Sequence, residues 1–269
     1  MPLSLVLMRS TPTSCPTIDL RLPGAVAFTT LRGCSDPSEP YDGFNACHYT
    51  GDSPHHVTLC REQMASTLGL DNPSLLILPR QTHSARIEVV DATSASMPLE
   101  GVDGLVTSDP SVAIGVSTAD CVPILMSDPV AGVIAAVHSG WRGTVERIAA
   151  RAVDAMTGIG ASPRRIICVL GPYIHREAYE VGPELIEIFT HTFGPGLDYW
   201  PEGAQRPHLD LGRAVIHTLT GCGIPQSNIS EIGICSYTEF DRVFSARKLG
   251  VASGRTLTVA RLDRSNASI

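Results

Sequence analysis

Short apolar runs separated by turn residues dominate the middle of the chain. Six runs of this kind lie between residues 75 and 138, at 75–78, 86–90, 104–107, 112–117, 122–126 and 133–137. Asp-Gly and Asp-Pro dipeptides punctuate them, as at Asp103-Gly104 and Asp109-Pro110. Runs of this length and spacing predict β-strands. Because little helix fits between them, we expect mixed or antiparallel sheet instead of a regular strand–helix alternation.

Helical patterns flank this strand-rich region. Ser53-Pro54 resembles an N-cap followed by proline in the first turn, which predicts a helix to about residue 68. Apolar residues at helical spacing predict a second helix over 144–156. Further helices are expected at 183–193 and 211–219, and further strands at 24–31, 166–170, 229–235, 243–246 and 257–261. The glycine- and proline-rich stretch 194–207 is expected to be a loop.

These elements predict an α+β fold in a single catalytic domain over residues 24–269. Residues 1–23 contain several prolines and read as a loose N-terminal lead-in. No internal repeat or domain boundary stands out.

The composition narrows the classes of function. The chain has 269 residues, 43% of them apolar, and a formal net charge of −7. Such a chain has material for a large core and lacks the basic surplus of a protein that binds nucleic acid through bulk charge. No apolar stretch reaches the roughly 20 residues needed to span a bilayer, so no membrane partner is expected. The start of the chain lacks the order of charges of a secretory signal.

We therefore expect a cytoplasmic protein in which the eight cysteines stay reduced. No Cys-x-x-Cys pair occurs, and the glycine-rich dinucleotide and P-loop motifs, the zincin motif and the hydrolase nucleophile elbow are absent.

Three predicted strands are followed by, or end in, side chains able to bind a metal or act as a nucleophile. These side chains are His83, Cys121 and His138. Each has an ordinary interpretation taken alone, as a structural histidine or a small buried cysteine. If strand ends bring them together, the set suits Zn²⁺ and leaves one coordination position open, as catalytic zinc sites do. The residues alone leave this choice open.

Two arginines are candidates for binding an anion. Arg142 lies in Gly140-Trp141-Arg142-Gly143, where a strand gives way to a helix, and Arg32 follows the first predicted strand. An arginine at either place can clamp a phosphate. The alternative interpretations are a tight glycine turn with a packed tryptophan, and an ordinary surface arginine.

The sequence resembles the YfiH-type proteins, long called polyphenol oxidases or laccase-domain proteins. The matching pieces run in order from about 24 to 261, and the most specific are Ala119-Asp120-Cys121 and His138-Ser139-Gly140-Trp141-Arg142-Gly143. Other pieces include Arg80-Gln81-Thr82-His83, Val102-Asp103-Gly104, Tyr179-Glu180-Val181-Gly182 and Cys235-Ser236-Tyr237. Two positions depart from the family pattern, because Cys34 and Ser84 stand where the family commonly has glycine.

The resemblance implies a layered α/β sandwich with mixed β-sheets and helices packed outside. It implies a zinc site made by His83, Cys121 and His138, with copper possible in vitro. It also implies phosphorolysis of inosine, adenosine and methylthioadenosine, together with deamination of adenosine. By this analogy Arg32 takes part in catalysis and binds the phosphate or ribose, while Arg142 and Asn45 are further candidates for substrate binding. The expected partners are a purine nucleoside and phosphate, with the chain acting as a monomer or homodimer.

Two other interpretations remain open, and a third lacks the ligands that it needs. A Cys–His hydrolase, such as an amidase, would use Cys121 as nucleophile with His138 or His83 as its base. A non-enzymatic zinc-binding protein would need the same residues for stability alone. A multicopper oxidase would need many histidines, whereas the chain has nine and no His-x-His pair.

Overall fold

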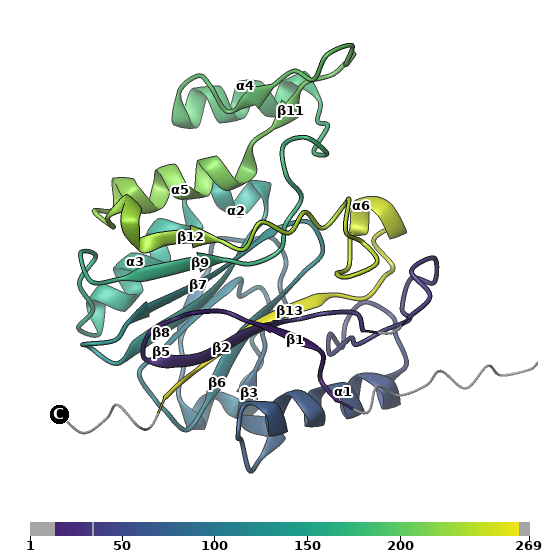
Figure 1. The fold of residues 1–269 in the computed structure, drawn as a ribbon. Coiled ribbons are helices and arrows are strands. Elements are labelled where there is room, and N and C mark those ends of the chain that lie inside the picture. Colours follow the sequence, from purple (N-terminus) through teal and green to yellow (C-terminus); the bar gives the residue numbers. More distant parts are fainter. Residues whose placement is uncertain (1–13, 34, 264–269) are drawn as a thin grey trace, which may run out of the picture.

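Two β-sheets stacked face to face form the centre of the protein. A computed structural model describes residues 14–33 and 35–263 (Figure 1). One sheet has five strands in the order β1-β2-β13-β6-β3. Its strands are β1 (Thr17–Asp19), β2 (Ala25–Thr30), β3 (Leu76–Ile77), β6 (Ala113–Thr118) and β13 (Thr256–Leu262). The other sheet has six strands in the order β12-β9-β7-β8-β5-β4. Its strands are β4 (Ile87–Val89), β5 (Gly104–Thr107), β7 (Val122–Asp128), β8 (Val133–Ser139), β9 (Ile167–Leu170) and β12 (Ile229–Glu231).

Both sheets are mixed. The pairs β3–β6, β4–β5 and β9–β12 are parallel, and the remaining neighbours within these two sheets are antiparallel. The expected α+β class with mixed sheets is therefore confirmed.

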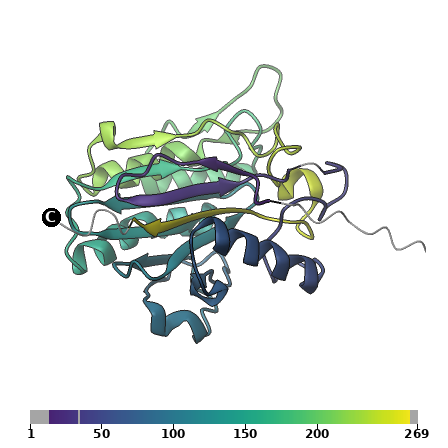
Figure 2. The same cartoon turned by 60° about the horizontal axis from the view of Figure 1, so that its bottom comes forward.

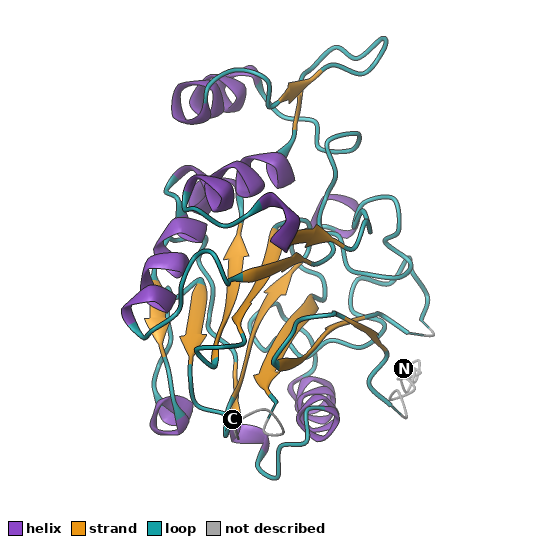
Figure 3. Ribbon diagram, turned by 60° about the vertical axis from the view of Figure 1, so that its left-hand side comes forward, coloured by secondary structure: helices purple, strands orange, loops and turns teal. Residues whose placement is uncertain are grey.

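Helices cover the outer face of each sheet (Figures 2 and 3). The helices are α1 (Pro54–Thr67), α2 (Trp141–Val145), α3 (Ile148–Gly158), α4 (Pro183–Phe193), α5 (Leu211–Gly221) and α6 (Ala246–Leu249). Short 3₁₀ turns lie at η1 (Pro73–Leu75), η2 (Ala92–Ser96) and η3 (Gln226–Asn228). Among the helices of the described chain, none combines the length and apolar character that crossing a bilayer requires.

Three apolar cores lie between these layers. Alternate residues of a strand point to opposite faces, so Leu125 of β7 packs between the sheets while Ile124 and Met126 face α3 and α5. In the same way Val259 of β13 faces α1 and Ala260 faces the second sheet. The layers thus run helix, sheet, sheet, helix, which is the expected sandwich.

The expected helix over 144–156 is two helices. Arg147 separates α2 from α3 and adopts a left-handed backbone with φ of 61°. Its guanidinium lies 4.1 Å from the centroid of the Phe193 ring and donates a hydrogen bond to the carbonyl of Thr192. These contacts tie the break to the end of α4, a feature that periodicity cannot reveal. The apolar face predicted for residues 148–156 is buried as expected.

Three other expectations need correction. The lead-in is not loose throughout, because β1 pairs with β2; residues 1–13 lie outside the described part of the chain. The stretch 243–246 is not a strand, because the Ser245 side chain accepts from the backbone N–H of Lys248 and caps α6. The loop at 194–207 contains β10 (Asp198–Tyr199), which pairs with β11 (His208–Leu209).

Candidate functional site

The chain crosses from one sheet to the other at the same end of the sandwich between β3 and β4, between β6 and β7, and between β12 and β13. His83 lies on the crossover from β3 to β4, and Cys121 lies on the crossover from β6 to β7. His138 is near the end of β8. The ligand atoms of these three residues all lie within 4.8 Å of one another. The side chains therefore meet as expected, but between two sheets and not along the edge of one.

Asp103 holds the His83 loop in place. Its carboxylate accepts hydrogen bonds from the backbone N–H groups of Thr82, His83 and Ser84, at 3.1, 2.9 and 2.9 Å. His83 has a left-handed backbone with φ of 62°, a conformation that costs energy for a residue with a side chain. The three hydrogen bonds stabilise this conformation and so fix where the imidazole lies.

The same carboxylate orients His138. Nδ1 of His138 and Oδ1 of Asp103 are 2.7 Å apart, and both side chains are almost fully buried. When Nδ1–H donates to the carboxylate, Nε2 is left as the ligand atom, an arrangement common among metal-binding histidines. The backbone N–H of His138 also donates to the carbonyl of Asp103.

Electrostatics favours an ionised thiol at Cys121. Burial alone favours the neutral thiol, but the charge of His138 and hydrogen bonds from His138 and His83 outweigh it and lower the pKa of Cys121. For His138, burial favours the neutral ring, but the charge of Cys121 and the hydrogen bond to Asp103 raise its pKa. A thiolate is the form that binds metals or attacks an electrophile.

Gly140 lies against this cluster and leaves it space. A Cβ atom at this position would lie 2.8 Å from Cδ2 of His83 and 3.0 Å from Sγ of Cys121. The backbone of Gly140 is extended, with φ of −76°, so the conformation itself does not require glycine. The close approach of the two side chains is therefore what requires glycine here.

The donor set fits a zinc ion. Donors bound to one tetrahedral Zn²⁺ lie about 3.3–3.8 Å apart, given bond lengths of about 2.0–2.3 Å. The ligand atoms lie within 4.8 Å of one another, which is near that spacing, and His83 is exposed. Among residues 14–33 and 35–263 this is the one group of three histidine, cysteine or acidic side chains gathered in this way. His138 is at the buried side of the cluster and His83 at the exposed side.

Asp120 ties the C-terminal segment to the cluster. This residue precedes Cys121 and has φ of 89°. Its carboxylate accepts from the hydroxyls of Ser236 and Ser245 and from the backbone N–H of Arg247. Residues 236–247 are thereby held beside Cys121.

Arg32 has a different role from the expected one. Its side chain is fully buried, and its guanidinium donates to the carbonyls of Asp36, Pro37, Glu39, Asp42 and Phe240. It also lies 4.6 Å from the centroid of the Phe244 ring. With its donors engaged by backbone oxygens, Arg32 organises a loop and has none left for phosphate, which corrects its assignment as a catalytic and phosphate-binding residue.

Asn45 is also part of a buried network. Its Nδ2 donates to Asp52, and its Oδ1 accepts from the backbone N–H groups of Cys47 and Arg255. The side chain is fully buried, which corrects its assignment to substrate binding: Asn45 instead holds the backbone of two segments together.

Arg142 is the candidate that remains exposed. Its guanidinium lies 4.3 Å from the centroid of the neighbouring Trp141 ring. Of the two departures from the family pattern, Cys34 lies outside the described residues. Ser84 is accommodated, because its backbone is not left-handed and its hydroxyl donates to the carbonyl of Gly101.

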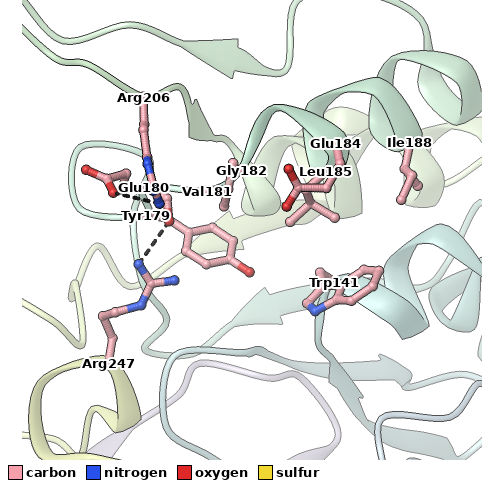
Figure 4. Close-up of a pocket in the computed structure, with 10 residues that line it drawn as sticks. All are labelled: Trp141, Tyr179, Glu180, Val181, Gly182, Glu184, Leu185, Ile188, Arg206 and Arg247. Carbon is pink, nitrogen blue, oxygen red and sulfur yellow. Dashed lines mark hydrogen bonds and ion pairs between the residues drawn. The ribbon is translucent and has the colours of Figure 1, made fainter.

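A cavity of about 500 Å³ lies beside the start of α2 (Figure 4). Trp141, which follows Gly140, forms part of its wall, and Tyr179 and Arg247 form another part. The backbone N–H of Arg247 donates a hydrogen bond to the carboxylate of Asp120, which precedes Cys121. The wall of the cavity is therefore connected to the residues that position Cys121.

Reasoning from residue types missed Asp103 and Tyr179, and it left open whether Asp120 supports the site or is a structural cap. Each lies within a sequence piece that matches the YfiH pattern, and that was the available signal. Aspartates beside glycine or cysteine in a turn resemble ordinary turn residues, and only the fold shows what their carboxylates hold.

Comparisons with known proteins agree with this picture. A model of the family described as multi-copper polyphenol oxidoreductase laccase matches residues 25–263. A protein named adenosine deaminase RL5, from an unknown prokaryotic organism, is 42% identical over 244 residues, covering 87% of this chain and 93% of the relative. A purine nucleoside phosphorylase of Bacteroides thetaiotaomicron is 37% identical over 247 residues, covering 86% and 89%. The crystal structure of YlmD from Geobacillus stearothermophilus superposes with a TM-score of 0.81 at 29% identity, covering 90% and 93%.

Proposed function

Because the chain belongs to the multi-copper polyphenol oxidoreductase laccase family, we propose that it is a metal-dependent enzyme that acts on purine nucleosides. The observation that carries the proposal is the His83–Cys121–His138 cluster, whose His83 is exposed, together with a nearby cavity of small-molecule size. The names of the two relatives, one a deaminase and one a phosphorylase, supply the substrate class. The expected zinc is the metal we propose, with copper able to take the same ligands in vitro.

Phosphorolysis is the first proposed reaction. A phosphate oxygen forms a bond to C1′ of the ribose while the bond from C1′ to the purine nitrogen breaks. The electron pair of the broken bond leaves with the purine, which takes up a proton. The chain must therefore position an anion next to C1′, and we assign this role to the exposed Arg142, four residues after His138.

Deamination of adenosine is the second proposed reaction. Water oxygen bonds to C6 of the base, the bond from C6 to the amino nitrogen breaks, and ammonia leaves. A bound Zn²⁺ would supply Lewis-acid chemistry and lower the pKa of water. The chain contributes the ligands and, through Asp103, fixes the orientation of two of them.

The experiment is a product assay with zinc-loaded protein. Inosine should yield hypoxanthine and ribose 1-phosphate only when inorganic phosphate is present, and adenosine should yield inosine without phosphate. Arg142→Ala should raise the KM for phosphate about 10-fold or more, whereas the exposed Arg164→Ala serves as the matched control and should not. Absence of both products from metal-loaded wild-type protein would contradict the proposal.

A Cys–His hydrolase is the second candidate, and one observation favours it. Cys121, His138 and Asp103 form the order of nucleophile, base and orienting carboxylate known from cysteine hydrolases. Metal analysis distinguishes the candidates. A tightly bound stoichiometric metal would occupy the thiolate, whereas metal-free protein whose Cys121 is trapped as an acyl-enzyme would support the hydrolase.

A further inference from the structure

The cavity beside the metal cluster has a wall suited to a flat aromatic ligand. It is lined by Trp141, Tyr179, Leu185, Ile188, Arg206 and Arg247, among others. In Figure 4 the rings of Trp141 and Tyr179 border the same open space. Leu185 and Ile188 on α4 add an apolar side to the cavity.

One short segment of the chain, Gly140-Trp141, links the cavity to the metal cluster. Trp141 follows Gly140, where an added Cβ would meet both His83 and Cys121. Burial and then the negative charge of Cys121 raise the pKa of Tyr179 to about 12. The phenol of Tyr179 is therefore a neutral hydrogen-bond donor at neutral pH. Trp141 thus connects the wall of the cavity to the residue that lies against the cluster.

The hydroxyl of Tyr179 is available to form a hydrogen bond with a ligand. Within the described part of the chain, no residue is its hydrogen-bond partner, although the ring is mostly buried. The guanidinium carbon of Arg247 lies 5.4 Å from the centroid of the Tyr179 ring. The guanidinium carbon of Arg142 lies 4.3 Å from the centroid of the Trp141 ring. Two cation-backed aromatic rings and one unused hydroxyl suit a planar heterocycle with hydrogen-bonding nitrogens.

We propose that this cavity binds the purine base of the nucleoside, stacked against Trp141 and hydrogen-bonded by the Tyr179 hydroxyl. The inference rests on the proposed function for the reaction at the neighbouring metal. It assigns base recognition to residues outside the metal cluster and makes Tyr179 a specificity-determining residue.

The two tryptophans of the chain allow a direct test. Trp141 lines the cavity, whereas Trp200 is 57% exposed and does not line it. Trp200→Phe leaves Trp141 as the sole tryptophan, and Trp141→Phe leaves Trp200. Inosine is titrated into each zinc-loaded variant without phosphate, and tryptophan fluorescence is recorded.

Saturable quenching in Trp200→Phe and none in Trp141→Phe supports the proposal, since stacking on a purine quenches indole fluorescence. Quenching only in Trp141→Phe overturns it. A third outcome is that the wild type and Trp200→Phe convert inosine equally well with phosphate, but inosine does not change the fluorescence of Trp200→Phe. This outcome overturns the proposed base site and leaves the proposed function standing. If neither conversion nor binding of inosine occurs in the wild type, the proposed function fails as well.

A second variant tests the hydroxyl alone. Tyr179→Phe keeps the ring and should raise the KM for inosine about 5–10-fold while leaving the KM for phosphate unchanged. Tyr199→Phe, on β10, is the matched control and should change neither constant. An unchanged KM for inosine in Tyr179→Phe would overturn the role of the hydroxyl.

Discussion

Oδ1 of Asp103 lies 2.7 Å from Nδ1 of His138 and also accepts the backbone N–H of His83 at 2.9 Å. One carboxylate thus sets the orientation of one imidazole and the backbone position of the other. Burial favours the neutral acid, but the hydrogen bond and charge of His138, with the backbone N–H donors, lower the pKa of Asp103 to about 2. The carboxylate therefore stays charged at neutral pH and links two of the three proposed ligands.

Asp103→Asn should weaken zinc binding about 10–100-fold, because an amide cannot accept from all these donors at once. The measurement is a competition titration with a chromogenic chelator, paired with the inosine assay.

Asp128→Asn is the control for Asp103→Asn. Asp128 is a buried carboxylate that also accepts three backbone N–H groups, from Val130, Ala131 and Ser162, but far from the cluster along β7. Asp128→Asn should lower the melting temperature of the protein without changing its affinity for zinc. Equal zinc affinity in the two variants would refute the role given to Asp103.

Gly140→Ala should reduce zinc affinity and activity by about 10-fold or more, since the added Cβ would press on His83 and Cys121. Gly158→Ala, at the end of α3 where a Cβ meets nothing within 4 Å, should keep both and gain about 0.5–1 kcal/mol of stability. Zinc titration and thermal unfolding of the two variants make the comparison. Full zinc affinity in Gly140→Ala would show that the cluster has more room than the structure gives it.

Arg32→Lys should destabilise the protein by about 2–4 kcal/mol, because three ammonium donors cannot replace a guanidinium bonded to five carbonyl groups. The KM for phosphate of the folded variant should be unchanged. Chemical unfolding and steady-state kinetics check the two halves of the prediction. A raised KM for phosphate with normal stability would restore Arg32 as a phosphate ligand.

The His56–Asp52 pair predicts a pH-dependent stability. The hydrogen bond to Asp52 and then that to Cys60 raise the pKa of His56 to about 10, from a usual value of 6.5. A raised folded-state pKa contributes stability that is fully present below pH 6.5 and is lost as pH rises through 10. The loss of stability in His56→Gln, on the order of 1 kcal/mol, should therefore be larger at pH 6 than at pH 10.

His55→Gln, at the exposed neighbouring position, is the control and should show no such pH dependence. Unfolding curves at the two pH values provide the test. A pH-independent difference for His56→Gln would mean that the charged pair adds nothing.

The sequence predicts the strands and long helices well where burial repeats regularly. The period-two pattern around Leu125 and the helical face from Ile148 to Met156 are examples. Features that depend on distant contacts are not predictable in this way. The break at Arg147 depends on Phe193, and the turn at Ser245 depends on Asp120, and neither partner is near in sequence.

The site shows the same division. The residue types of His83, Cys121 and His138 indicate a metal, and the fold brings them together. Arg32 follows a strand just as a phosphate-binding arginine could, yet the carbonyl oxygens that surround it come from a loop whose path the sequence does not reveal. Asp103 shows the opposite case. Its residue type and position are those of an ordinary turn residue, whereas its hydrogen bonds position two of the three proposed ligands.

The most direct test of the account is cobalt binding to metal-free protein. One equivalent of Co²⁺ should produce a thiolate-to-cobalt charge-transfer absorption in the wild type, and Cys121→Ser should lose this band while keeping its melting temperature. The same band in Cys121→Ser, or none in the wild type, would contradict the claim that His83, Cys121 and His138 hold one metal ion.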